Sequence, residues 1–220
     1  GIRGLVRSRG LGDVYKRQRP DGAARGDQGV TSRCALVWDQ KIVFARYIED
    51  CGVPCEHVTP HMLATPFYRG RFVTMIVPTG FGNPEFSNLL PALRAAAPRI
   101  NRFVKSGGRL LVFGAACDNA AAYDWLPFNL AYHHHYGSCR IENDQSHPCS
   151  AFLTDYDTSC VECDGYFTGH EGVVVASADG RPVMIEVDTG EGRIIASTVH
   201  EYPSRGFVKE FCTAKGETLF

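Results

Sequence analysis

The sequence predicts an α/β fold: a three-layer, flavodoxin-like, doubly wound sheet that is mostly parallel and carries an antiparallel C-terminal extension. Two observations lead to this prediction. In the first half, short apolar runs alternate with segments of helical spacing, which is typical of parallel βαβ units with right-handed crossovers. In the second half, apolar runs are separated by glycine-containing turn signals, which indicate antiparallel strands joined to the same sheet.

The first half contains the elements that define the sheet. Four segments predict strands, at residues 34–38, 53–58, 72–77 and 109–113. The first, CALVW, is a continuous apolar run and is expected to be buried. A helix is expected over residues 42–51, where the apolar spacing is helical and Gly52 follows as a C-terminal signal. A second helix is expected over residues 89–104, in which Pro98 predicts a kink or a break.

The second half changes in character. Residues 123–163 are rich in aromatic residues, histidine and cysteine but show no clear periodicity, so an irregular insertion is expected there. Three apolar runs follow and predict strands, at residues 173–176, 182–187 and 194–199. A closing helix is expected over residues 207–212.

The sequence divides into a leader, one domain and a tail. Residues 1–31 are expected to be a non-native or disordered leader, because residues 8–18 (SRGLGDVYKRQ) back-translate to a sequence that resembles a transposase-based sequencing adapter. Residues 32–212 form the single expected domain, and residues 213–220 a tail.

Charge and composition exclude several classes of protein. The formal net charge is −1, and it becomes −5 without residues 1–18, which excludes a globally basic nucleic-acid-binding protein. No apolar run approaches the roughly 18 residues that span a membrane. Nine cysteines, odd in number and irregularly spaced, favour a reducing cytoplasm over a disulfide scaffold. A small-molecule ligand is therefore the expected partner, and a homo-oligomer stays open.

Topology alone indicates where a ligand would bind. In open α/β sheets the crevice lies beyond the carboxyl ends of the strands. This rule selects Asp39, the loop at residues 79–83 and the loop at residues 114–118. Asp39 has an equally good alternative role as the N-cap of the helix that begins near Ile42.

Several short motifs are similar to one known superfamily. Residues 78–82 (Pro-Thr-Gly-Phe-Gly) resemble the Pro-Gly-Gly-Phe-Gly turn of the class I glutamine amidotransferase-like superfamily, and residues 190–195 resemble its last strand. Residues 107–118 look like a Gly-Gly-Gly-Phe-Val-Gly-Leu-His-Ala-Ala-Thr-Asp stretch of its ThuA-like (trehalose-utilisation) branch. His147-Pro148 and residues 163–166 resemble two further elements of that branch, in the same order.

The resemblance implies a catalytic arrangement and a ligand class. In an amidotransferase site, Cys117 would be the nucleophile, His200 the base and Glu201 the group that orients it, with N–H donors from Gly80 and Phe81. The superfamily's Gly-x-Cys-x-Gly turn places the nucleophile one position earlier, at Ala116. In the ThuA-like register, Gly114 replaces that branch's histidine, and no nucleophile is expected. The implied ligand is small and polar, such as a sugar derivative or an amide. Its expected contacts are Asp39, Thr79, Gly80, Phe81, Gly114, Ala115, Asp118, His147, Asp164 and Tyr166.

A metal site is the alternative use of the histidine- and cysteine-rich segment. A Cys-x-x-Cys pair with two further Cys or His ligands makes a tetrahedral zinc site, although the spacing matches no standard finger. The candidate ligands are His133, His134, His135, Cys139, His147, Cys149, Cys160 and Cys163. The preferred interpretation assigns no metal and no cofactor; a nicotinamide cofactor in particular is not expected, because no Gly-x-Gly-x-x-Gly follows the first strand. Three hypotheses stay open: a site that binds or hydrolyses a ligand without a cysteine nucleophile, a Cys117-dependent amidase, and a zinc-stapled binding module.

Overall fold

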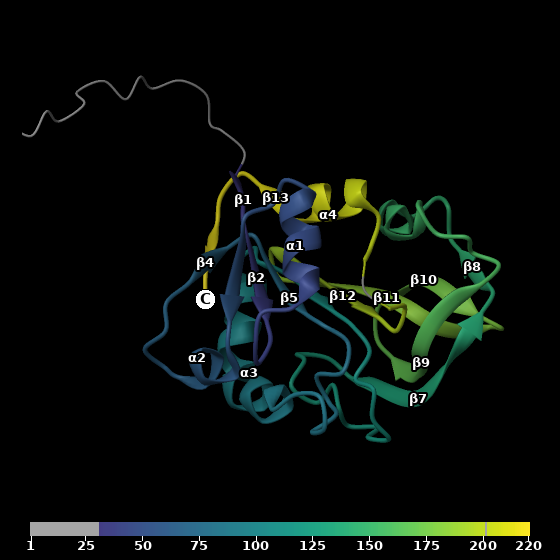
Figure 1. Cartoon of the computed structure of the whole chain (residues 1–220), viewed down its shortest axis with the longest axis horizontal. Helices are drawn as coiled ribbons and strands as arrows, with labels where there is room; N and C mark the ends of the chain where they lie inside the picture. The colour runs from purple at the N-terminus through teal and green to yellow at the C-terminus, as the bar shows by residue number, and fades with distance from the viewer. Residues whose placement is uncertain (1–30, 201) are drawn as a thin grey trace, which may run out of the picture.

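The computed structural model describes residues 31–200 and 202–220, and it is built around one eight-stranded sheet (Figure 1). The strand order is β3-β2-β5-β6-β12-β11-β10-β8. In chain order these strands are β2 (Cys34–Val37), β3 (Cys55–Val58), β5 (Thr74–Val77), β6 (Arg109–Val112), β8 (Ile141–Asn143), β10 (Val173–Ala178), β11 (Arg181–Thr189) and β12 (Gly192–Ser197).

The two halves of this sheet differ in strand direction. Neighbouring strands from β3 through β2, β5 and β6 to β12 are parallel, while β11, β10 and β8 extend the sheet with antiparallel pairs. The predicted α/β class, with a large parallel sheet and additional antiparallel strands, is therefore confirmed. The final parallel strand, β12, comes from the last of the predicted apolar runs.

Helices cover both faces of the parallel strands, which explains why these strands are continuously apolar. Along β2, Ala35 and Val37 pack into a core shared with helices α2 (Pro60–Ala64) and α3 (Leu89–Lys105). The alternate residues of β2 pack into a second core with α1 (Val43–Asp50) and α4 (Arg205–Phe211). A strand buried on both faces has no polar side to alternate with.

The helix α3 runs through Pro98 without the break that the sequence predicts. Pro98 is exposed, so the carbonyl that lacks its usual N–H partner faces solvent rather than the core. The buried face of α3 is formed by apolar residues that precede and follow the proline, including Leu93 and Ile100. Packing of this face therefore holds the helix together across the proline.

The expectation of an irregular insertion at residues 123–163 is wrong for a large part of that segment. It contains a long strand, β7 (Leu130–Cys139), which pairs antiparallel with β9 (Val161–His170) in a separate two-stranded sheet. Between them lie β8 and a 3₁₀ helix, η1 (Pro148–Leu153). Exposed and half-buried positions dominate the second part of β7, so the period-two pattern that signals a strand is missing there.

Short strands tie the chain's last residues to the body of the protein. β13 (Thr213–Ala214) pairs with β1 (Thr31–Ser32), and β14 (Thr218–Leu219) pairs with β4 (Arg71–Phe72). Residues 213–220, which the sequence sets apart as a tail, therefore cross back over the edge of the domain, and Phe220 is buried in the core beside α3. The expected leader lies almost wholly outside the described residues.

No helix within the described part of the chain is long and apolar enough to cross a membrane.

The contact between Gly192 and the end of α3 gives a test of the packing. A Cβ atom at Gly192 would lie 2.1 Å from the carbonyl oxygen of Val104 and 2.2 Å from that of Gly108, and both are backbone atoms. We expect Gly192→Ala to lower the free energy of unfolding by about 1–3 kcal/mol, because overpacking forces the backbone to shift. Urea denaturation with an unchanged m-value measures this loss. Gly216→Ala is the matched control, since a Cβ there meets nothing within 4 Å, and an equal loss in both variants would contradict the explanation.

Candidate functional site at the carboxyl edge of the sheet

The chain turns sharply where it leaves β6. Residues 114–118, which form an elbow, follow this strand, and Ala116 adopts a φ of 51°. This left-handed conformation is uncommon for a residue other than glycine. A turn of this kind after a strand is how α/β enzymes expose a nucleophile above their sheet. Here the residue at the turn is alanine, at the position where the superfamily motif has its cysteine.

A buried carboxylate from β9 holds the elbow in place. The Ala116 N–H donates to Asp164 Oδ2 at 2.8 Å, and the Asp164 side chain is almost completely buried. The Tyr132 hydroxyl donates to the same oxygen at 2.5 Å, and His134 Nδ1 lies 3.5 Å from the other. Burial and the nearby Asp164 charge raise the pKa of Tyr132 far above its usual range, so this phenol stays a neutral donor.

Gly114 is required for this arrangement. A Cβ atom at Gly114 would lie 2.2 Å from Asp164 Oδ2, inside any permitted contact. The structure therefore brings together Gly114 and Asp164, two residues that the sequence predicts as ligand contacts. Their direct relationship is structural: the missing side chain of one leaves room for the carboxylate of the other.

The loop at residues 79–83 packs against the elbow through its backbone. The N–H groups of Gly80 and Gly82 donate to the carbonyl oxygens of Gly114 and Ala115, at 2.8 and 3.1 Å. A Cβ atom at Gly82 would lie 2.8 Å from the Cys117 sulfur, so glycine permits this close approach. The Gly80 N–H that the resemblance assigns to an oxyanion is engaged with Gly114 in this structure.

Of the three predicted catalytic residues, Cys117 lies on the elbow itself. Its thiol is half-buried, and this burial raises its pKa; a hydrogen bond from the Asn119 backbone acts in the opposite direction, while Asp164 and Asp118 raise it further. A cysteine in such surroundings holds its proton at neutral pH.

The other two catalytic candidates come after β12. The backbone N–H of His200 donates to the Glu162 carbonyl oxygen at 3.1 Å, and its ring meets the Tyr136 ring edge-on at 5.6 Å. Glu201 lies outside the described residues. The roles of Cys117, His200 and Glu201 as nucleophile, base and orienting group stay predictions.

Asp39, at the carboxyl end of β2, faces the start of α3 rather than the start of α1. Its carboxylate accepts hydrogen bonds from the Ser87 hydroxyl at 2.5 Å and from the Asn88 backbone N–H at 3.2 Å and side-chain amide at 3.1 Å. The first residue before α1, Ile42, has no side-chain cap. Burial alone would raise the pKa of Asp39, but these hydrogen bonds outweigh it and lower the pKa.

The remaining predicted ligand contacts are dispersed. Thr79 and Asp118 lie at the carboxyl edge, half-buried and exposed respectively, whereas Phe81 is fully buried against the Tyr123 ring. The Tyr166 ring lies beneath the Arg181 guanidinium, whose central carbon is 4.6 Å from the ring centroid, and His147 lies beside Glu186 of β11.

The described residues do not gather the histidine- and cysteine-rich segment into one site. Cys139 and Cys163 bring their sulfur atoms within 3.1 Å of one another, while Cys160 is exposed. His147 and Cys149 instead meet Glu186 of β11, a residue that none of the sequence predictions included. The sequence feature that could have pointed to Glu186 is that it is the one carboxylate inside the apolar run at residues 182–187.

A polar cavity of about 540 Å³ opens beside the chain that follows the elbow. Two carboxylates, of Asp124 and Glu171, lie in its lining together with Phe128 and Asn129. The Arg94 Nε donates to Asp124 at 2.8 Å, and the Asn129 amide donates to Glu171 at 2.9 Å. The lining thus offers hydrogen-bonding groups beside an aromatic ring.

Comparison with known proteins places this geometry in a wider fold group. No family model matches the sequence, and no curated protein matches it. A solved structure from Thermoplasma acidophilum, provisionally named as part of a GMP synthase, is similar with a TM-score of 0.55 and 13% identity, over 83% of this chain and 92% of that one. A cytoplasmic protein from Salmonella typhimurium LT2 is similar with a TM-score of 0.50 and 16% identity, over 80% and 93% of the two chains.

A third similar structure is a larger enzyme. It is the cold-adapted β-galactosidase of Rahnella sp. R3, with a TM-score of 0.52 and 11% identity, and the match covers 82% of this chain but 30% of that one. At these identities the likeness shows the fold alone. The chain therefore shares its α/β fold with these three structures.

The Asp39 contacts give a prediction for acid stability. A carboxyl whose pKa is lower in the folded than in the unfolded protein contributes stability above the unfolded pKa of about 3.9, and that contribution is lost as the pH falls through the folded value. We expect Asp39→Asn to lower the free energy of unfolding by about 1–2 kcal/mol at pH 7, and the difference from wild type to shrink in acid. Urea melts from pH 7 to pH 2.5 would measure it. Asp118→Asn, at an exposed position, is the control. If the difference in the free energy of unfolding between wild type and Asp39→Asn did not change with pH, the assignment would be contradicted.

Proposed function

We propose that this chain is a ThuA-like domain of the glutamine amidotransferase-like superfamily that binds or hydrolyses a small polar ligand without a cysteine nucleophile. The observation that carries the proposal is the left-handed Ala116 at the elbow. The backbone turn that would present a nucleophile is there, held by Asp164, but its side chain is a methyl group. The order of the five parallel strands, 2-1-3-4-5 by sequence, supports a flavodoxin-like arrangement of layers.

The ligand would sit at the carboxyl edge of the parallel strands, above the elbow. Asp39, Thr79 and Asp118 all follow strands that end at this edge. The polar cavity lined by the chain that follows the elbow would add Asp124 and Asn129 as hydrogen-bonding groups. Groups of this kind recognise hydroxyls and amides, which supports a sugar derivative or an amide as the ligand. A cytoplasmic location is part of the proposal, as in the similar Salmonella protein.

Ligand binding is tested by thermal unfolding with neutral sugars and amides. We expect trehalose, glucose or L-glutamine to raise the melting temperature, because a ligand at a hundredfold excess over its Kd stabilises the folded state by about 2.7 kcal/mol. Asp118→Asn and Asp124→Asn should reduce the shift, with Glu142→Gln on the distant strand β8 as the control. If no ligand of either class shifts the melting temperature, or if all three variants respond as wild type does, the proposed site is wrong.

The absence of a working nucleophile is tested at Cys117. Since the thiolate is the reactive form and burial raises the pKa of Cys117, we expect this thiol to react with iodoacetamide more slowly at pH 7.5 than the exposed Cys160, and faster as the pH rises above 9. Peptide mass spectrometry of the folded protein gives both rates. Release of ammonia from L-glutamine should stay at background in wild type and in Cys117→Ser alike. Glutamine hydrolysis that Cys117→Ser abolishes would instead establish the Cys117-dependent amidase.

A further inference from the structure

A second polar cluster lies away from the carboxyl edge, around a carboxylate in the antiparallel part of the sheet. Glu186 of β11 is 6% exposed, and its two oxygens have different surroundings. Oε1 accepts from Arg193 Nε at 2.6 Å. Oε2 lies 3.2 Å from His147 Nε2 and 2.9 Å from the Cys149 sulfur. One oxygen is thus neutralised by a guanidinium, while the other is shared by an imidazole and a thiol.

The local sequence explains why these side chains converge. His147 and Cys149 flank Pro148 at the start of η1, where a 3₁₀ turn projects both toward β11. Glu186 reaches them from the strand that pairs with β12, and Arg193 comes from the beginning of β12 itself. The four residues therefore belong to three elements whose positions are fixed by the sheet and by the packing of η1 against α4.

The donor atoms and their spacing are those of a transition-metal site. A ring nitrogen of His147, the Cys149 sulfur and a Glu186 oxygen all lie within 4.8 Å of one another. Imidazole, thiolate and carboxylate are the three side-chain donors that zinc takes, at about 2.0–2.3 Å. Tetrahedral bonds of these lengths put donor atoms roughly 3.3–3.5 Å apart. The His147–Glu186 distance of 3.2 Å is close to this value, and the Cys149–Glu186 distance of 2.9 Å needs to open by about 0.6 Å. The His147 nitrogen and the Cys149 sulfur lie within 4.8 Å, so a small movement of η1 brings them to the same spacing.

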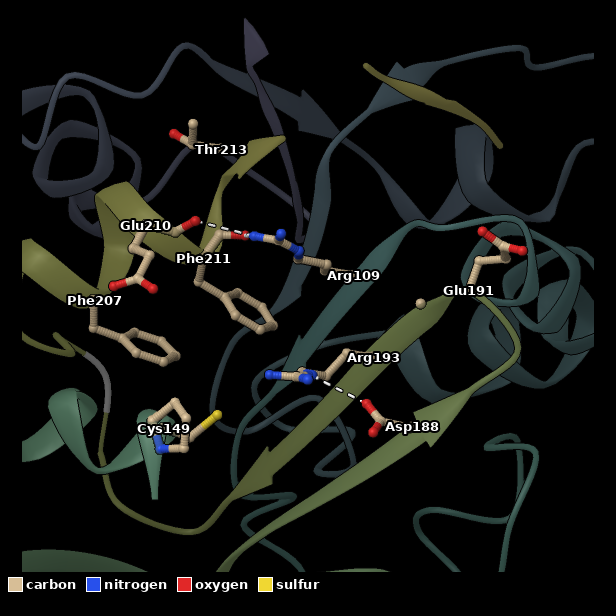
Figure 2. A pocket seen from close by; sticks show the side chains of 11 residues that line it. Arg109, Cys149, Asp188, Glu191, Arg193, Phe207, Glu210, Phe211 and Thr213 are labelled. Carbon is tan, nitrogen blue, oxygen red and sulfur yellow. Dashed lines mark hydrogen bonds and ion pairs between the residues drawn. The ribbon is translucent and has the colours of Figure 1, made fainter. Parts of the chain in front are cut away.

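The cluster is also accessible from solvent on two sides. A cavity of about 390 Å³ is lined by Cys149 and Arg193 (Figure 2). A second one, of about 440 Å³, is lined by His147, Glu186 and Arg193. In Figure 2 the Cys149 sulfur points toward the Arg193 side chain. A cation has an entry path, and water has room to fill a fourth coordination position.

We propose that His147, Cys149 and Glu186 bind one divalent transition-metal ion of the zinc class, with Arg193 positioning the carboxylate. The proposal is independent of the function proposed for the carboxyl edge. On binding, the Cys149 thiol proton is released to solvent, and the sulfur and one Glu186 oxygen become ligands. Arg193 keeps its ion pair with the other oxygen and so holds the carboxylate in one orientation, as outer partners of metal ligands do.

Coordination through His147 Nε2 has a further consequence in η1. His147 Nδ1 accepts the Cys149 backbone N–H at 3.2 Å, which caps the first turn and leaves the ring proton on Nε2. A metal ion at Nε2 takes the place of that proton. The neutral ring then carries its proton on Nδ1, which can no longer accept. Metal binding therefore breaks this cap, and the Cys149 amide reports it.

The decisive experiment is a zinc titration of tag-free, chelator-treated protein. Isothermal calorimetry should give one Zn²⁺ per chain, and Cys149→Ser and Glu186→Gln should each weaken binding by more than about 100-fold, beyond the 10- to 100-fold typical of outer partners. Cys160→Ser, which removes an exposed cysteine, is the matched control and should bind as wild type does. No binding to wild type, or binding that Cys149→Ser leaves unchanged, would overturn the proposal.

Two measurements on the wild-type chain keep the test valid if a variant fails to fold. Titration with Co²⁺ should produce a thiolate-to-metal charge-transfer band and the intense visible bands of tetrahedral coordination. In a ¹H–¹⁵N spectrum, Zn²⁺ should move the Cys149 amide resonance while leaving that of Ala116, at the opposite edge, in place. A Co²⁺ spectrum without thiolate bands, or a Cys149 amide unmoved by saturating Zn²⁺, contradicts the site.

Discussion

The carboxyl edge of this protein depends on one hydrogen bond, from the Ala116 N–H to the buried carboxylate of Asp164. The acceptor lies on β9, in the small two-stranded sheet, and the donor lies on the turn after β6, in the large one. A buried carboxylate is tolerated only where donors surround it, and Ala116 and Tyr132 supply them. The same carboxylate keeps Ala116 in a left-handed conformation that its own side chain disfavours.

The close packing around this hydrogen bond explains why glycine occupies the neighbouring positions. Gly114 leaves space for the Asp164 carboxylate, and Gly82 leaves space for the Cys117 sulfur. With backbone this close to backbone, the N–H groups of Gly80 and Gly82 are used to join the two loops. The two loops at this edge are thus joined backbone to backbone, and only side chains at its rim are left to contact the ligand that we propose. The metal cluster at Glu186 lies outside this edge and shares no residue with it.

Much of the fold could be predicted from the sequence, because strands buried on both faces give continuous apolar runs such as residues 109–113. The strands β7 and β9 could not, since many positions of β7 face solvent and break the alternation. Motif order singled out Gly114 and Asp164 as ligand contacts, a role that stays a prediction, and the structure places the two side by side. The sequence analysis did not single out Tyr132 and Glu186, because their partners lie far away in sequence and neither residue belongs to a recognisable local motif. Asp39 was placed at the correct edge, but its partner helix is α3 rather than the one that follows it.

The separation between Ala116 and Asp164 bears on how the molecule reaches its folded state. The bond closes over 48 residues, and the intervening segment contains β7, β8 and η1. Contacts between distant residues form after local ones, because the entropy of the closed loop has to be offset first. The turn at Ala116 would therefore acquire its conformation only when β9 has docked. A nascent chain that ends before β9 contains the parallel strands β2, β5 and β6, but it lacks the Asp164 carboxylate that shapes the turn at their carboxyl edge.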